Sequence, residues 1–175
     1  MSGFRLTRQD MLRLFTLLDE ELASGDVHGE LYLVGGAVMC LALDARHATR
    51  DVDGYFRPTD VIRQAARRVA GRADVPPDWL NDAVKGYLSP RGDFDPYLDL
   101  EHLKVYVARP GYLLAMKCAA MRLGEEFRDL DDVRYLLRHL NLTSIDEALE
   151  IVTRYFDEER LPPKTRLALE ELLPG

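Results

Sequence analysis

A glycine pair between two short apolar segments constrains the fold more than any other feature of the chain. The run LYLV at residues 31–34 is typical of a strand, and Gly35 and Gly36 end it. The segment that follows, AVMCLAL, has helical character. Residues 51–56, DVDGYF, alternate in polarity and contain aromatic side chains, which predicts a second strand. We therefore expect a strand, a turn, a helix and another strand at the centre of an α+β fold.

Helices and strands are also mixed in the rest of the first half. Periodicity and capping residues predict helices at residues 7–24 with Thr7 as the cap, at 59–72 with Thr59 as the cap, and briefly at 78–88. Turn-forming residues fill 89–96, and 97–108 is typical of two short strands joined near Glu101.

From Pro110 onward the chain is predicted to be helical. One helix should run to about Arg122, and two or three more should follow, with Ser144 and Pro163 at helix starts. We expect a core at residues 1–109, a small mixed sheet flanked by helices, and a helical C-terminal part at 110–175 packed on it. The fold class is thus α+β.

Charge is distributed unevenly along the chain. The net charge of −7 argues against a nucleic-acid partner, but residues 46–72 hold seven arginines against three aspartates. Arg63, Arg67 and Arg68 lie on the predicted helix within this segment and are candidate RNA contacts. The alternative is an ordinary solvated helix face.

Other sequence features limit the cellular setting. No apolar run reaches the length needed to cross a membrane, and the N-terminus does not resemble a signal peptide. Cys40 and Cys118 lie in apolar runs typical of reduced core cysteines. We expect a cytoplasmic protein without a membrane partner.

Asp51 and Asp53 are the strongest local signal for chemistry. On a strand, side chains two residues apart point to the same side, so both carboxylates would face one space. Two such carboxylates repel each other unless a cation lies between them, and Mg²⁺ or Mn²⁺ would also bridge triphosphate oxygens. The alternative is a strand end with two solvated acids.

Gly35 and Gly36 are candidates for phosphate binding. A glycine turn before a helix exposes backbone N–H groups to an anion, although a tight packing turn explains the pair equally well. The spacing of a dinucleotide-binding fingerprint is absent.

Lys117 lies in the middle of a helix that is apolar nearly all round. A buried lysine needs an anion nearby, either a bound phosphate or a carboxylate. Asp132 is a candidate partner for Lys117 or for the metal site, and the alternative is a first-turn acid favoured by the helix dipole.

The four histidines, 28, 47, 102 and 139, show no metal-ligand spacing, so the sequence gives little support for zinc. It suggests no arrangement for nucleophilic hydrolysis either.

Together these segments resemble the polymerase-beta-like nucleotidyltransferases, in which a strand, a glycine turn and a helix precede a strand with Asp-x-Asp. The chain is most similar to the AbiEii/MenT-type nucleotidyltransferases and to a related group with a Trp-Leu-Asn segment. The matching stretches lie between residues 31 and 140: LVGGAVMCLAL, TRDVDGYF, PPDWLNDAVKGYL, VYVARPGYLLAMKCAAMR and RDLDDVRYLL.

The resemblance implies an enzyme that transfers a nucleotide from an NTP, with Asp51 and Asp53 as metal ligands. It assigns Lys117 and Asp132 to catalysis, and Gly35, Gly36, Thr49, Arg50 and Lys117 to nucleotide binding. The family's serine after the first glycine is Gly36 here. A third carboxylate is ambiguous, because Asp99 and Glu101 are both expected on one strand face.

Members of this group include toxins of toxin–antitoxin pairs that modify the 3′ end of tRNA. The resemblance therefore implies a tRNA acceptor and a cognate antitoxin protein. Two alternatives remain open: a nucleotidyltransferase acting on a protein or a small molecule, or an antitoxin or binding module that keeps only the fold.

Overall fold

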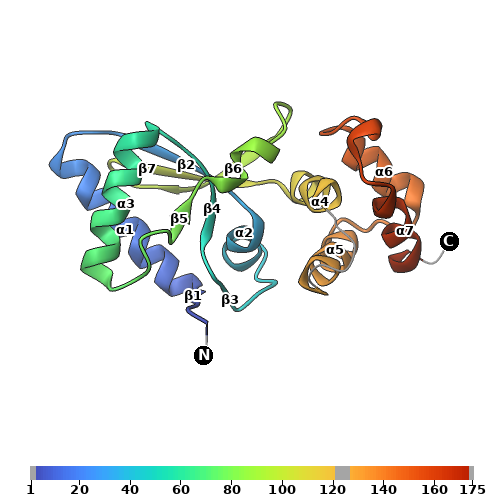
Figure 1. Ribbon diagram of the computed structural model, residues 1–175, viewed down its shortest axis with the longest axis horizontal. Coiled ribbons are helices and arrows are strands. Elements are labelled where there is room, and N and C mark those ends of the chain that lie inside the picture. The colour runs from blue at the N-terminus through green and yellow to red at the C-terminus, as the bar shows by residue number, and fades with distance from the viewer. Residues whose placement is uncertain (1–2, 121–126, 174–175) are drawn as a thin grey trace. The chain divides into compact units, whose positions relative to one another are not determined.

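The computed structural model describes residues 3–120 and 127–173. In this part of the chain the fold is α+β, as the sequence predicts. The chain forms two compact units. The first consists of Met1–Gly86 with Phe94–Ala108 and contains the sheets, and the second consists of Tyr87–Asp93 with Arg109–Gly175 and is helical (Figure 1).

The first unit is built on a five-stranded mixed sheet in the order β5-β4-β2-β7-β6. Its strands are β2 (Gly29–Val34), β4 (Val52–Arg57), β5 (Leu80–Asn81), β6 (Phe94–Asp99) and β7 (Leu103–Ala108). The central strand β2 pairs antiparallel with β4 and parallel with β7. Two short strands, β1 (Leu6–Thr7) and β3 (Ala48–Thr49), form a separate antiparallel pair.

Helices α1 (Arg8–Ser24) and α3 (Thr59–Ala73) lie side by side over one face of this sheet (Figure 1). A Cβ atom added at Gly29 would meet Ile62 of α3 and Leu22 of α1, so both helices pack closely on the central strand. Alternate residues of β2, β4 and β7 are buried, which is the pattern of a sheet with one covered face. The core of the unit lies between this face and the two helices.

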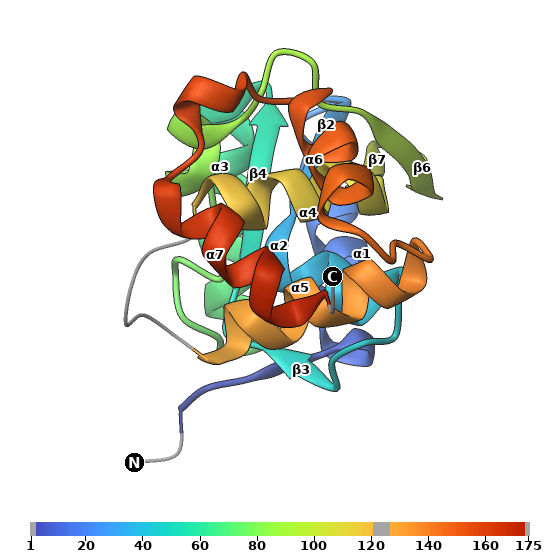
Figure 2. The ribbon, with the colours of Figure 1, turned by 90° about the vertical axis from the view of Figure 1, so that its right-hand side faces the viewer.

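The helical unit contains α4 (Pro110–Ala119), α5 (Phe127–His139), α6 (Ile145–Thr153) and α7 (Pro163–Leu172), with a 3₁₀ helix, η2, at Glu158–Arg160 (Figure 2). Helix α4 contacts both α5 and α6. Residues 87–93 join this unit through the backbone N–H of Ser89, which donates to the Tyr112 hydroxyl at 2.9 Å. The Tyr155 hydroxyl also donates to Asp93 at 2.9 Å.

Several predicted boundaries are confirmed. Thr7 and Asp10 form the expected capping box before α1, and Ser144 caps α6 by accepting a hydrogen bond from the Glu147 N–H. The turn at Gly35 leads directly into α2 (Gly35–Leu41). Local signals suffice at these points because each involves residues within one turn of the chain.

Other predicted boundaries were wrong. Thr59 is the first residue of α3 and its hydroxyl donates to the Phe56 carbonyl, so Pro58 occupies the cap position. The segment 78–88 is not one helix, because strand pairing with β4 makes β5 from Leu80–Asn81. Only a 3₁₀ helix, η1 (Ala83–Tyr87), follows.

Two further predicted boundaries concern the strand pair β6–β7 and the helix α4. Strand β6 begins at Phe94, inside the segment predicted as a loop, because Phe94 pairs with Ala108 of β7. The predicted end of the fourth helix at Arg122 lies outside the described residues. No helix in residues 3–120 and 127–173 has the length and apolar character needed to cross a membrane.

Candidate functional site

The glycine turn and Asp53 meet where β2 ends and β4 begins. Antiparallel pairing places Asp53 opposite Val34, the residue before the turn. Gly35 has φ +68°, a conformation that strains any residue with a side chain. A Cβ atom added at Gly35 would lie 3.6 Å from Asp53 Oδ2. The structure therefore brings the predicted phosphate turn and one predicted metal ligand together.

Asp51 reaches this site by a different route from the one predicted. Strand β4 begins at Val52, so Asp51 lies in a bend before the strand, and the prediction of two aspartates on one strand was wrong. Asp51 is half-buried, and its Oδ2 accepts a hydrogen bond from Asn81 Nδ2 at 3.2 Å. A side-chain contact across two segments thus holds Asp51.

Burial and nearby charges shift the pKa of Asp51. Burial raises the pKa of the Asp51 carboxyl, the hydrogen bond from Asn81 opposes this shift, and the charge of Asp78 adds to it. The positive charge of Arg50 lowers the Asp51 pKa, but it is the smallest of the four influences. An ion bound at Asp51 would stabilise the charged form that burial disfavours.

Asn81 was not singled out as a site residue from sequence, although it lies in the Trp-Leu-Asn segment. Its position follows from β5, which pairs parallel with β4 and places Asn81 beside Asp53. Trp79 anchors this segment: its carbonyl accepts from the Val52 N–H at 2.6 Å, and its ring N–H donates to the Ala66 carbonyl at 2.9 Å. The buried tryptophan fixes the strand that carries the asparagine.

The second glycine of the turn faces Thr49 and Arg46. A Cβ atom added at Gly36 would lie 2.7 Å from Thr49 Oγ1 and 2.9 Å from Arg46 Nη1. These two groups thus occupy the space beside the turn that a serine at position 36 would need. Thr49 is buried, and its hydroxyl donates to the Asp51 carbonyl at 3.3 Å. Arg46 is a second site residue that sequence reasoning missed, since nothing marked it out from its neighbouring arginines.

Asp99 and Glu101 do not join this site. Asp99 ends β6 and pairs with Lys104 at the start of β7, at the opposite end of the sheet from Asp53. Glu101 lies in the connection between β6 and β7, so it shares no strand face with Asp99. In the described residues, no third carboxylate completes a compact group of possible metal ligands with Asp51 and Asp53.

Lys117 and Asp132 belong to the helical unit, where they form an ion pair. Lys117 Nζ lies 3.0 Å from Asp132 Oδ2, and the two side chains are 18% and 6% exposed. The carboxylate that the sequence suggested as a partner for Lys117 is therefore its partner in the structure. The pair joins α4 to α5.

The arginines of α3 are largely engaged in ion pairs. Arg63 pairs with Asp60 and with Asp82, and Arg68 pairs with Glu21 of α1 at 2.7 Å. Arg67 is exposed. Acidic neighbours thus neutralise part of the charge that the sequence predicted to face RNA.

The face of the sheet opposite α1 and α3 carries a row of aromatic side chains. The rings of Tyr55, Tyr32 and Tyr106 stack across three strands, with centroids 4.6 Å and 4.8 Å apart, and Phe94 meets Tyr32 edge-on at 5.3 Å. Asp53 is two residues from Tyr55 on β4, so both point to this face. These four residues are partly buried.

Comparisons with protein-family models, with curated proteins and with solved structures found no match for this chain. The function is therefore argued from the geometry of the site and from the motifs in the sequence.

Proposed function

We propose that this chain is a metal-dependent nucleotidyltransferase that transfers an NMP group from an NTP to an acceptor hydroxyl and releases pyrophosphate. One observation carries the proposal: the Asp53 carboxylate lies against the Gly35 turn, at the junction of β2 and β4. Carboxylates beside a glycine turn supply the two elements that NTP chemistry requires, a cation site and space for phosphate oxygens.

The donor set fits Mg²⁺ or Mn²⁺. Asp51 and Asp53 offer carboxylate oxygens, which hard divalent cations prefer. Burial disfavours the negative charge of Asp51, and a bound cation would stabilise that charge. A metal ion held by these two residues would neutralise phosphate charge as it develops during transfer. Asn81 fixes the orientation of Asp51 through its amide hydrogen bond.

The remaining residues of the turn suit the phosphates themselves. The Arg46 guanidinium and the Thr49 hydroxyl lie beside Gly36, where they can bind phosphate oxygens. Arg50, two residues before the strand, adds positive charge at this end of the sheet. In the reaction the acceptor hydroxyl gives its proton to solvent water as its oxygen forms a bond to the α-phosphorus. The bond from that phosphorus to the bridging oxygen breaks, and pyrophosphate leaves with the bonding electrons.

The aromatic row supports a nucleoside on the same face. A nucleotide with its phosphates at Asp53 can extend along Tyr55 and Tyr32, and aromatic side chains bind bases by stacking. The family resemblance supports the 3′ end of tRNA as the acceptor, within a toxin that has a cognate antitoxin protein. It also assigns Lys117 and Asp132 to the reaction.

The test is incubation of the full chain with each of the four NTPs, labelled at the α-phosphate, together with Mg²⁺ and total RNA. We expect label in the tRNA fraction, its loss on adding EDTA, and its loss in Asp53→Asn. The exposed Asp60→Asn is the matched control and should keep full activity. Transfer that survives both EDTA and Asp53→Asn would show that this site is not responsible.

The same assay separates the alternatives. Label in a protein or in a small-molecule fraction would show that the chain is a nucleotidyltransferase whose acceptor is not tRNA. Absence of label from every fraction, together with absence of NTP binding, would leave the fold as a binding module or antitoxin.

A further inference from the structure

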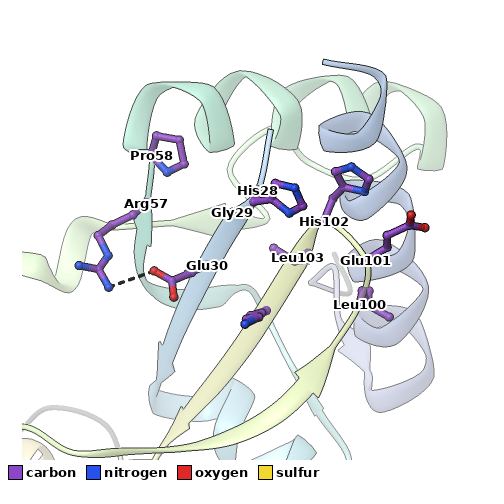
Figure 3. Close-up of a pocket in the computed structure, with 10 residues that line it drawn as sticks. His28, Gly29, Glu30, Arg57, Pro58, Leu100, Glu101, His102 and Leu103 are labelled. Carbon is purple, nitrogen blue, oxygen red and sulfur yellow. Dashed lines mark hydrogen bonds and ion pairs between the residues drawn. The ribbon is translucent and has the colours of Figure 1, made fainter. Parts of the chain in front are cut away.

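A pocket of about 610 Å³ lies at the end of the sheet opposite Asp53 (Figure 3). It is lined by residues that precede or begin β2 and β7, by Arg57 at the end of β4 and by Pro58 after it. His28 and His102 face each other here, because Gly29 pairs with Leu103 and each histidine is the residue just before its strand (Figure 3). The strand register thus brings together two histidines that are far apart in the sequence.

His102 is held in place by its backbone. The Gly29 N–H donates to the His102 carbonyl at 2.8 Å, and the His102 N–H donates to Asp19 Oδ1 of α1 at 2.7 Å. The two imidazole rings stack with centroids 4.7 Å apart and planes 13° from parallel. Asp26, in the turn after α1, brings its Oδ1 to 3.9 Å from His102 Nε2.

One ring nitrogen of His102 is buried without a hydrogen-bond partner in the part of the chain that the structure describes. Its side chain is only 14% exposed, and its Nδ1 is buried without a hydrogen-bond partner among the described residues. A buried imidazole that makes so few polar contacts loses solvation without compensation. The other ring nitrogen, Nε2, lies 3.9 Å from Asp26 Oδ1 and is the atom that a metal ion would bind.

The three side chains have the donor set of a transition-metal site. One possible ligand atom from each of Asp26, His28 and His102 lies within 4.8 Å of the other two. Tetrahedral Zn²⁺ with bonds of 2.0–2.1 Å holds its ligand atoms about 3.4 Å apart, so binding requires these atoms to approach one another by up to about 1.4 Å. His28 and Asp26 are exposed, so the Asp26 side chain can rotate and the His28 ring can turn out of its stack toward a shared ion with His102, which is held by its burial.

We propose that Asp26, His28 and His102 form a Zn²⁺ site that is separate from the Asp51–Asp53 site and independent of the proposed function. Two imidazole nitrogens and one carboxylate suit Zn²⁺, whereas Mg²⁺ prefers oxygen ligands alone. Three protein ligands would leave the fourth position of a tetrahedral ion to water or to a ligand group. Such an ion would join the turn after α1 to the β6–β7 hairpin.

The experiment is calorimetric titration of ZnCl₂ into the metal-free full chain in the presence of excess Mg²⁺. We expect one equivalent of Zn²⁺ to bind at this site and a higher Tm with Zn²⁺ than with Mg²⁺ alone. His28→Gln and Asp26→Asn should each weaken Zn²⁺ binding by at least about tenfold, because even the loss of a group that only orients a metal ligand costs that much. The exposed His47→Gln is the matched control and should bind like the wild type.

Three results would overturn the site: no Zn²⁺ bound, unchanged affinity in His28→Gln, or loss of binding in Asp53→Asn. The last result would place Zn²⁺ at the aspartates. His102→Gln should abolish binding, and circular dichroism reports whether this buried change preserves the fold. Because His28 and Asp26 are exposed, their variants decide the question even if His102→Gln does not fold.

Discussion

Asn81 shows how one side chain positions another at the candidate site. Its amide donates to Asp51 at 3.2 Å, and Asp51 lies outside the regular strand that would otherwise orient it. We expect Asn81→Ala to lower nucleotidyl transfer by about 10- to 100-fold, the range typical for the loss of a group that orients a metal ligand. Steady-state kinetics at increasing Mg²⁺ measures this, and the loss should be partly recovered at high Mg²⁺.

The exposed amide of Gln64 on α3 provides the control for this prediction. Gln64→Ala should behave like the wild type. Equal activity of Asn81→Ala and Gln64→Ala at all Mg²⁺ concentrations would contradict the positioning role.

The raised pKa of Asp51 predicts how stability depends on pH. A carboxyl whose pKa is higher in the folded protein than in the unfolded chain binds protons more tightly when folded, so its contribution is complete below the unfolded value near 3.8. That contribution is lost as pH rises through the higher folded pKa. In EDTA at neutral pH, Asp51→Asn should therefore have a higher Tm than the wild type, because it removes a charge that burial disfavours.

Thermal unfolding of the wild type and Asp51→Asn between pH 4 and pH 8 tests the predicted direction of the difference in Tm. The advantage of Asp51→Asn should grow with pH, and Mg²⁺ should stabilise the wild type more than the variant. A variant that is less stable than the wild type throughout this range would contradict the assignment.

At the scale of secondary-structure elements, Lys117 and Asp132 join α4 to α5 by a mostly buried ion pair. Replacing Lys117 by Met deprives the nearly buried carboxylate of this partner, which should lower the free energy of unfolding by about 3 kcal/mol. The double variant Lys117→Met with Asp132→Leu should recover most of that loss, because apolar pairs often replace buried ion pairs at little cost. Chemical denaturation measures both effects.

The double variant also separates stability from catalysis. A stable double variant without transferase activity would support the catalytic assignment that the family resemblance makes. A stable and fully active one would show that the pair is only structural.

At the scale of the whole molecule, the net charge of −7 repels the phosphates of RNA. RNA binding therefore depends on arginines whose charge is not neutralised by an acidic neighbour. Arg63 and Arg68 are paired with Asp82 and Glu21, whereas Arg67 is exposed. We expect Arg67→Gln to reduce the salt dependence of tRNA binding by about 0.7–0.9 in log–log slope, the value for one phosphate contact. Arg68→Gln should change it less, since its charge is already neutralised.

Filter binding of labelled tRNA over a range of salt concentrations gives these slopes. If both variants match the wild type, this face of α3 does not contact RNA. The aromatic row on the opposite face of the sheet would then be the surface to mutate next.

The sequence by itself determined much of the local structure. The strand, glycine turn and helix at residues 31–43, the capping box at Thr7 and the cap at Ser144 were predicted because each depends on residues close together in the chain. The α+β class follows from the same local patterns. The pairing of Lys117 with Asp132 was among the alternatives because a buried lysine requires a nearby anion.

Only the tertiary structure decided which distant residues meet. Strand pairing turned Leu80–Asn81 into a strand and brought Asn81 to Asp51, against the local helical pattern. The pairing of β2 with β7 brought His28 to His102, although their spacing gave no sign of a metal site. Register sets such contacts, and register depends on the packing of whole faces of the sheet, which no local segment encodes.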